Sequence, residues 1–197
     1  MSVENVRLKI LREALKLFAD KGYAGVSIGE IAEACDMKTP NLYKYFSGKE
    51  EIFESIKKET EAAYSNHKGV GAGSMVWIHN AKEFKEFTMH FIKQTMENQD
   101  AQNARKFCTV EQYHDDSLKG ILSEKQYVAI CKQYEEIFAG LIELGAIEDT
   151  DPEMLALEYS CPGTIILQEC DRYPERKDEL LARLEKFVDY FIEKTFN

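Results

Sequence analysis

The chain has 197 residues, of which 44% are hydrophobic, and carries a formal net charge of −10. That is enough apolar material for one or two compact domains, and no stretch reaches the roughly 18 uncharged apolar residues that a membrane span needs. The segment Met1–Ile10 already carries Glu4, Arg7 and Lys9, unlike a signal peptide, so we expect a cytoplasmic protein without a membrane partner.

The charge is unevenly distributed along the chain. Residues 1–50 hold eight Lys or Arg and seven Asp or Glu, a net charge of +1, whereas residues 51–197 hold 17 and 28, a net charge of −11. An acidic bulk repels DNA, so a DNA-binding function would require the N-terminal part to present its cations on one face. The asymmetry indicates that the two parts have different roles.

The N-terminal part begins with two predicted helices. Val3–Lys21 has apolar residues three and four positions apart, and Gly22 ends it as a C-terminal cap. Ser27 opens the second helix, and Glu30 three residues later completes a capping box. Both helices therefore have an apolar face and a defined end.

A tight break at Asp36 leads into a short third helix. Asp tolerates the left-handed backbone better than most residues other than glycine. The third helix is predicted over Thr39–Tyr45, with Pro40 in its first turn. Ser47–Glu50 is interpreted as a second capping box, which starts a fourth helix that runs to about His67.

The remainder of the chain also has helical periodicity and shows no strand-like alternation or internal repeat, so the fold class is all-α. A Gly-rich seam at Gly69–Ser74 precedes the longer helices. These are predicted over Ala81–Asn98, Ala101–Tyr113, Ser117–Leu144, Pro152–Arg172 and Arg176–Thr195.

The second and third helices, with the tight turn between them, have the parts of a helix-turn-helix motif. In this motif the later helix enters the DNA major groove, which is wide enough for one α-helix. Leu42 and Phe46 are four residues apart and should share the inward face, so their polar and aromatic neighbours should point outward. Ordinary core packing of these aromatic residues is the alternative.

These motifs carry a resemblance to a known family. Ser27–Ala32, Leu42–Phe46 and Lys49–Phe53, in this order and spacing, resemble the DNA-binding domain of TetR/AcrR-type bacterial transcriptional regulators. The resemblance covers about residues 4–64. It implies a regulator, by default a repressor, that binds a palindromic double-stranded DNA operator as a homodimer and is released by a small-molecule effector.

The resemblance also implies a division of labour along the chain. Residues 1–48 are expected to form the helix-turn-helix DNA-binding domain, and residues 49–197 a helical-bundle domain for ligand binding and dimerisation, with the fourth helix as connector. The chain departs from the family pattern at Asp36, where a turn glycine is usual. It departs again at Lys38, where a Ser or Thr usually caps the third helix.

The resemblance assigns DNA contacts to individual positions. Tyr43 matches a tyrosine that touches phosphate, and Lys49 matches a lysine at a helix N-terminus, where a phosphate is attracted. Asn41 and Lys44 carry groups that suit base edges. The predicted DNA-binding residues are Ser27, Lys38, Thr39, Pro40, Asn41, Tyr43, Lys44, Tyr45 and Lys49.

The final helix is predicted to be a dimer interface, because its apolar stripe is wider than a terminal helix of one monomer should need. Packing within the subunit is the alternative. Two recognition helices about 34–36 Å apart would read two half-sites on one face of the duplex. The predicted interface residues are Leu180, Leu184, Phe187, Val188 and Phe191.

The middle helices are expected to enclose the effector, and their aromatic and thiol content suits an apolar or aromatic molecule with few polar anchors. Ordinary core packing is the alternative for each residue. The Pro162-Gly163 pair predicts a kink that widens the cavity or adapts the dimer interface. The candidate lining residues are Tyr64, Trp77, Phe87, Phe91, Phe107, Cys108, Tyr113, Tyr127, Cys131, Tyr134 and Cys161.

The cysteines leave one alternative open within the same fold. Their number is odd and their spacing wide, which argues against a disulfide framework or a zinc site and favours buried thiols. A redox- or metal-responsive regulator would use Cys108 with Cys131, or Cys161 with Cys170. An enzyme or a pure helical interaction module is a further alternative, but no catalytic residues, resident metal or cofactor are expected, because the histidines are scattered and no catalytic motif occurs.

Overall fold

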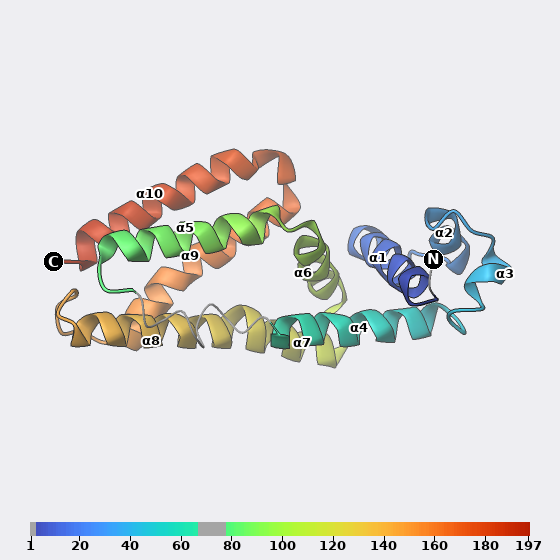
Figure 1. Ribbon diagram of the computed structural model, residues 1–197, viewed down its shortest axis with the longest axis horizontal. Coiled ribbons are helices and arrows are strands. Elements are labelled where there is room, and N and C mark those ends of the chain that lie inside the picture. The colour runs from blue at the N-terminus through green and yellow to red at the C-terminus, as the bar shows by residue number, and fades with distance from the viewer. Residues whose placement is uncertain (1–2, 67–77) are drawn as a thin grey trace. The chain divides into compact units, whose positions relative to one another are not determined.

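The computed structural model describes residues 3–66 and 78–197 (Figure 1). Nearly all of these residues are helical, and the strand-like pairing among them is an isolated bridge between Ile147 and Phe196. Contacts divide the chain into two compact units. The first consists of the described residues of Met1–Asn66 and Gln99–Leu122, and the second of those of His67–Asn98 and Ser123–Asn197. The predicted all-α class is confirmed.

The first unit contains the predicted helix-turn-helix segment and a second group of helices from further along the chain. The first helix has the predicted bounds, and Gly22, with φ +71°, follows it. The helices are α1 (Val3–Lys21), α2 (Ile28–Ala34), α3 (Thr39–Leu42), α4 (Lys49–Asn66), α6 (Gln99–Glu111) and α7 (Asp116–Leu122).

The core of the first unit is a cluster of aromatic rings. Phe18 of α1, Phe53 of α4 and Phe107 of α6 are mutual neighbours, with ring centroids 5.3–6.3 Å apart. Because α6 packs on α1, Phe107 and its neighbour Cys108 are completely buried in this core. The prediction that these two residues line an effector site therefore needs correction: they stabilise the unit that carries the helix-turn-helix segment.

The unit boundaries differ from the predicted division at residue 48. Helix α4 packs on α1, and α6 and α7 contribute to the same core, so these helices belong to the first compact unit. The functional division into a DNA-binding domain over residues 1–48 and an effector domain over residues 49–197 stays a prediction.

The second unit is a helical assembly around its own aromatic core. Phe84, Phe138, Tyr159 and Phe191 have ring centroids 4.7–6.4 Å apart. Its elements are α5 (Ala81–Glu97), the π-helical turn η2 (Ser123–Val128), α8 (Ala129–Glu143), α9 (Pro152–Arg172), the short 3₁₀ turn η3 (Pro174–Arg176) and α10 (Lys177–Thr195).

The predicted helix over Ser117–Leu144 is confirmed as a continuous helical run over residues 116–143, but it contains a π-helical segment that the sequence did not predict. Helix α7 ends at Leu122, the π turn η2 follows, and α8 begins at Ala129. Leu118 and Leu122 belong to the core of the first unit, whereas residues of α8 belong to the core of the second. The side chains of α7 and α8 point into different cores, and the π turn between them changes the direction in which the side chains point around the helix axis.

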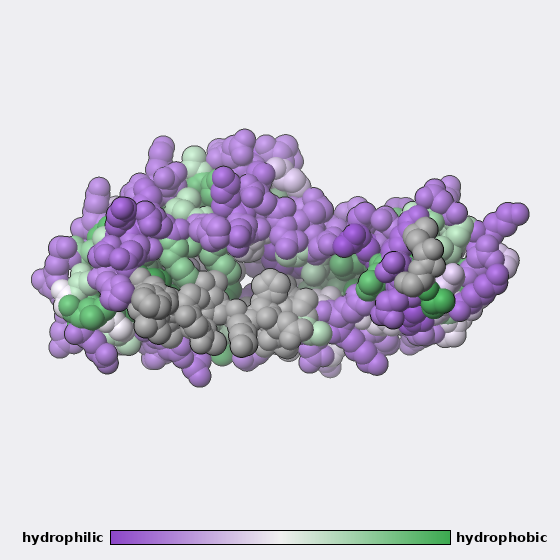
Figure 2. Space-filling model, in the orientation of Figure 1, coloured by the Kyte–Doolittle hydropathy of each residue, from purple (hydrophilic) through white to green (hydrophobic). Residues whose placement is uncertain are grey.

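The predicted dimer stripe on the last helix also needs correction. Leu180, Leu184, Val188 and Phe191 are at most 2% exposed, because α10 packs on α9 and α5 within its own unit. Phe187 is half-buried and packs against the same core. The width of the stripe reflects packing against two helices of the same chain. Hydrophilic residues cover most of the face of α10 seen in Figure 2.

Over residues 3–66 and 78–197, no helix is both long enough and apolar enough to cross a lipid bilayer.

Candidate functional site

The N-terminus of α2 is fixed by the predicted capping box. The Ser27 hydroxyl accepts a hydrogen bond from the Glu30 amide at 3.2 Å, and the Glu30 carboxylate accepts one from the Ser27 amide at 2.8 Å. Lys21 forms an ion pair with the same carboxylate at 2.8 Å. Hydrogen bonds from Lys21 and Ser27 lower the pKa of Glu30 to about 2. The capping box is confirmed, and the Ser27 side chain is engaged in it.

The turn between α2 and α3 is held by a lysine from α1. Asp36 adopts the left-handed conformation, with φ +57°, as the sequence predicted. The Lys9 ammonium donates hydrogen bonds to the Cys35 carbonyl at 2.9 Å and to the Asp36 carboxylate at 3.3 Å. An aspartate can therefore occupy a position where the family usually has glycine, because its side chain and the adjacent carbonyl share a cationic partner.

Helix α3 projects polar side chains around a buried anchor. It is shorter than predicted, ending at Leu42, and the chain continues in turns to Phe46, whose amide donates to the Leu42 carbonyl at 3.2 Å. Leu42 and Phe46 are 0% and 1% exposed, which confirms their predicted inward orientation. Of the predicted DNA contacts in this segment, Thr39 and Tyr45 are half-buried. The exposed ones are Lys38, Pro40, Asn41, Tyr43 and Lys44.

The far end of this segment is held by an arginine that the sequence reading missed. Arg7 of α1 donates a hydrogen bond to the Tyr45 carbonyl, and its guanidinium lies 4.0 Å from the centroid of the Phe46 ring. It also forms an ion pair with Glu51 at 3.6 Å. Together with Lys9, this places one α1 cation at each end of α3. The spacing of Arg7 and Lys9 on α1 gave no signal of these long-range partners.

The predicted capping box of Ser47 with Glu50 is wrong by one residue. The Glu51 carboxylate accepts hydrogen bonds from the Ser47 amide at 2.7 Å and from its hydroxyl at 2.8 Å. Helix α4 begins at Lys49, two residues after Ser47, so the side chain four positions on reaches back to it. These hydrogen bonds lower the pKa of Glu51.

Lys49 has contacts within the protein, and its predicted phosphate contact stays a prediction. Its ammonium donates hydrogen bonds to the Tyr23 and Val26 carbonyls, both at 2.7 Å, and lies 4.1 Å from the centroid of the Tyr23 ring. Two of the three ammonium donors are thus used within the protein. Lys49 connects α4 to the loop that precedes α2, and it supports the helix-turn-helix segment from behind.

A second anchor of the same loop comes from α6. The Glu111 carboxylate is buried and accepts a hydrogen bond from the Tyr23 amide at 2.6 Å. Nearby, Lys57 of α4 and Asp115 form an ion pair at 2.6 Å. Burial alone would raise the pKa of Asp115, but hydrogen bonds from Lys57 and Ser117 and the charge of Lys57 lower it to about 2. These contacts attach α6 and the following turn to α4 and the loop.

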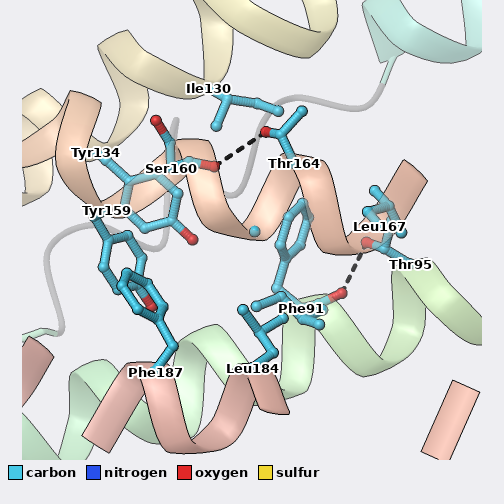
Figure 3. Close-up of a pocket in the computed structure, with 12 residues that line it drawn as sticks. Phe91, Thr95, Ile130, Tyr134, Tyr159, Ser160, Thr164, Leu167, Leu184 and Phe187 are labelled. Atoms are coloured by element: carbon cyan, nitrogen blue, oxygen red, sulfur yellow. Dashed lines mark hydrogen bonds between the residues drawn. The ribbon is translucent and has the colours of Figure 1, made fainter. Parts of the chain in front are cut away.

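The second unit contains a partly open cavity of about 70 Å³ between α5, α8, α9 and α10 (Figure 3). In Figure 3, Tyr134 and Tyr159 lie together on one side of the cavity and Phe91 and Leu184 on the other. The lining residues are Phe91, Ile92, Thr95, Ile130, Tyr134, Tyr159, Ser160, Gly163, Thr164, Leu167, Leu184 and Phe187.

Two predicted effector residues, Phe91 and Tyr134, line this cavity. Phe87 packs against the apolar core that includes the lining residues Tyr134 and Tyr159, and Cys131 is 3.5 Å from the hydroxyl of the lining residue Ser160. The other predicted residues do not line it: Tyr113 and Tyr127 are 78% and 56% exposed, and Cys161 is exposed on α9. The Tyr64 side chain and Trp77 lie outside the described residues.

The cavity is uncharged and contains hydroxyl groups. None of the described residues that line it carries a formal charge at neutral pH. The hydroxyls of Tyr159 and of the neighbouring buried residue Thr88 have no hydrogen-bond partner among the described residues. Burial raises the pKa of Tyr134 to about 12 and that of Tyr159 well above its ordinary value, so both phenols stay neutral at physiological pH.

The cysteines do not form the pairs that a redox switch would need. Cys108 is buried, and burial raises its pKa to about 12, which suppresses the reactive thiolate. Cys161 and Cys170 are nine residues apart on the intact helix α9, about 13 Å along its axis, too far for a disulfide. The expectation that all the thiols are buried is wrong for Cys161, which is exposed, and for Cys131, which is half-buried.

The fold and this site define a class of protein: an all-α chain with a helix-turn-helix in one unit and a cavity in the other. Residues 10–56 match the sequence model of the TetR family of bacterial regulatory proteins. This segment is therefore similar to the regulators of that family, and the whole chain has the fold of solved TetR-family regulators.

Sequence relatives agree over the same segment. The chain is 37% identical over 57 residues to the probable regulator YttP of Bacillus subtilis, covering 29% of this chain and 28% of that protein. It is 38% identical over 50 residues to IcaR, a negative transcriptional regulator of the biofilm operon icaADBC of Staphylococcus aureus, covering 25% and 27%. The aligned segment thus spans little more than a quarter of each of these relatives.

Structural similarity extends over the whole chain. A putative TetR-family regulator of Mesorhizobium loti has a TM-score of 0.68 and 20% identity, with 100% of both chains covered. The regulator AibR, solved with isovaleryl coenzyme A and operator DNA, has a TM-score of 0.61 and 18% identity, with 92% of this chain and 97% of that chain covered. At these identities the likeness concerns the fold.

Proposed function

We propose that this protein is a transcriptional repressor that binds a palindromic DNA operator as a homodimer and is released by a small-molecule effector. The observation that carries this proposal is the geometry of α3: a buried Leu42 at its end, surrounded by exposed Asn41, Tyr43 and Lys44. A protruding polar helix on a rigid anchor is what the DNA major groove accepts.

The side chains on α3 and the following turn have separate roles in this proposal. Asn41 and Lys44 are three residues apart and both exposed, so they can face the same groove. An Asn amide suits adenine and a Lys ammonium suits guanine. Tyr43, which is 52% exposed, is assigned to a phosphate, as is Lys38. Lys49 stays a predicted phosphate contact, and its ammonium also holds the loop before α2.

Repression and effector release are supported by the relatives. IcaR is a negative regulator, and AibR was solved with both an acyl coenzyme A and operator DNA. In our proposal the effector acts by binding more tightly to the conformation that does not fit DNA, because a ligand shifts an equilibrium only by its difference in affinity for the two states. The cavity of the second unit is the proposed effector site.

Dimerisation is assigned to the outer faces of α9 and α10, in place of the stripe that proved to be core. Ile165 on α9 is 64% exposed and Tyr190 on α10 is 62% exposed, while Met154 is 54% exposed near the start of α9. Replacing Ile165 with Asp should convert the dimer to a monomer in analytical ultracentrifugation and weaken operator binding. A dimer that persists in this variant would place the interface elsewhere.

The DNA assignment is tested by fluorescence anisotropy with the DNA upstream of the gene and a shuffled duplex of the same composition. Replacing Asn41 with Ala should weaken binding to the upstream DNA about 5- to 150-fold, equivalent to about 1–3 kcal/mol, and reduce discrimination against the shuffled duplex. Lys132→Ala, at an exposed position on α8, is the control for a surface substitution. Unchanged affinity and discrimination in Asn41→Ala would refute the assignment.

A further inference from the structure

We propose that the cavity of the second unit binds a small neutral molecule that carries one hydrogen-bonding group, and that Gly163 provides the space for it. The binding claim concerns the cavity alone. Its regulatory consequence, release from DNA, rests on the proposed function.

Gly163 leaves space on the inner face of α9. It is one helical turn after Tyr159 and Ser160 and one turn before Leu167, all of which line the cavity. Residues three and four apart share a face of a helix, so a side chain at position 163 would point to the same side. A Cβ built on Gly163 would meet no heavy atom of the described residues within 4 Å, apart from its own helix backbone and chain neighbours. The missing side chain therefore accounts for empty space on the cavity side of α9.

This glycine stands where helix stability alone would not select it. A glycine inside a helix costs roughly 1 kcal/mol relative to alanine. The preceding residue, Pro162, also lacks the amide that would continue the helical hydrogen bonds. The sequence predicted that Pro162-Gly163 could widen a cavity, and the open space at Gly163 supports that alternative.

The lining favours a neutral ligand. The cavity wall consists of aliphatic and aromatic side chains together with Ser, Thr and Tyr hydroxyls, with no charged group among its described residues. A carboxylate or ammonium placed there would lose its hydration without gaining a countercharge. Because both phenols titrate far above pH 7, the lining stays neutral across the physiological range.

The hydrogen-bonding group of the ligand is inferred from the hydroxyl of Tyr159. Tyr159 lines the cavity, is 4% exposed and has no partner for its hydroxyl among the described residues. A buried polar group without a partner is costly, and a ligand that supplies a partner removes that cost.

The size of the cavity limits the ligand. Drug-sized ligands occupy pockets of about 300–1,000 Å³, whereas an apolar cavity of about 150 Å³ has been found to bind benzene. The cavity measures about 70 Å³ in the absence of ligand, so even a single ring would require the lining residues to move apart.

The test is isothermal titration of the full chain at pH 7 with phenol, toluene and benzoate. These probes have the same ring and differ in the substituent: a neutral hydroxyl, a methyl group and a carboxylate. We expect phenol to bind at least about tenfold more tightly than benzoate, because the carboxylate would have to be desolvated. Phenol should also bind more tightly than toluene, because it can hydrogen-bond to a buried hydroxyl.

Two variants locate the site. Gly163→Leu should fill the space and abolish phenol binding, while its circular dichroism spectrum remains that of the wild type. Gly140→Leu on α8 is the matched control, because a Cβ there also meets nothing within 4 Å but Gly140 does not line the cavity. Tyr159→Phe should weaken phenol binding about three- to tenfold and leave toluene binding unchanged.

Three results would overturn the inference: no binding of phenol or toluene, benzoate binding as tight as that of phenol, or full phenol affinity in Gly163→Leu. A purely structural role of Tyr159 would change phenol and toluene affinities together. A failure of the proposed function would give a different result from a failure of this inference. In that case the wild-type protein would bind the probes but would not bind the operator.

Discussion

The two units of this protein use polar groups in opposite ways. In the first unit, Arg7 and Lys9 donate to backbone carbonyls on either side of α3, and Lys49 donates to carbonyls of the loop before α2. In the second unit, the hydroxyls of Tyr159 and Thr88 are buried without a hydrogen-bond partner among the residues that the structure describes. A reading surface needs its backbone fixed before DNA arrives, whereas an effector site can leave hydrogen bonds for the ligand to complete.

The largest expected effect is the loss of a cationic anchor in the first unit. Replacing Lys49 with Met should lower the free energy of unfolding by about 2–3 kcal/mol, because the Tyr23 and Val26 carbonyls lose a charged donor. Urea denaturation would measure this. Lys44→Met, at an exposed position, is the control and should change stability by less than about 0.5 kcal/mol. Equal stability of the two variants would contradict the anchor role of Lys49.

The next effect concerns pH. The pKa of Asp115 is lowered to about 2 in the folded protein, so its stabilising contribution is present above the unfolded pKa and is lost as the pH falls toward 2. We expect Asp115→Asn to cost about 1–2 kcal/mol at pH 7. The difference from the wild type should shrink progressively below about pH 4. A constant difference between pH 7 and pH 3 would show that the ion pair with Lys57 is not its source.

Replacing a glycine with alanine should change the free energy of unfolding in opposite directions in the two units. Gly22 has φ +71°, so Gly22→Ala should lower the free energy of unfolding by about 1–2 kcal/mol. Gly163 is in a helix with open space beside it, so Gly163→Ala should raise that free energy by up to about 1 kcal/mol. Thermal or urea unfolding of both variants would measure the contrast. Loss of stability in Gly163→Ala would mean that the space beside it is not available to a side chain.

The smallest change in the free energy of unfolding is expected at Asp36, in the turn between α2 and α3. Asp36→Ala should cost about 1 kcal/mol, because alanine tolerates φ +57° poorly and loses the contact with Lys9. Asp36→Gly should remain within about 0.5 kcal/mol of the wild type, since glycine adopts this backbone conformation freely. If the two variants are equally unstable, the side chain of Asp36 matters more than its backbone conformation.

Sequence patterns predicted the local features well. The bounds of α1 and α9, the capping box of Ser27 with Glu30 and the inward orientation of Leu42 and Phe46 depend on residues within one or two helical turns of each other. Such signals are contained in the spacing of side chains and in the chemistry of helix ends.

Long-range partners could not be predicted in the same way. The apolar stripe of α10 showed that this helix buries a face, but not that the covering surface is α5 and α9 of the same chain. Similarly, the charge of Lys49 suits a phosphate as well as the two carbonyls that it binds. Only tertiary geometry selects between such partners, and the same limit explains the misassignment of Phe107 and Cys108.

The most direct test of the central claim, that the exposed face of α3 binds DNA, is the salt dependence of operator affinity. For the wild type, the logarithm of the association constant should fall steeply with the logarithm of the salt concentration. Lys44→Ala should weaken binding and reduce this slope by about one, while Lys132→Ala leaves both unchanged. Identical affinities and slopes for the wild type and Lys44→Ala would contradict the account.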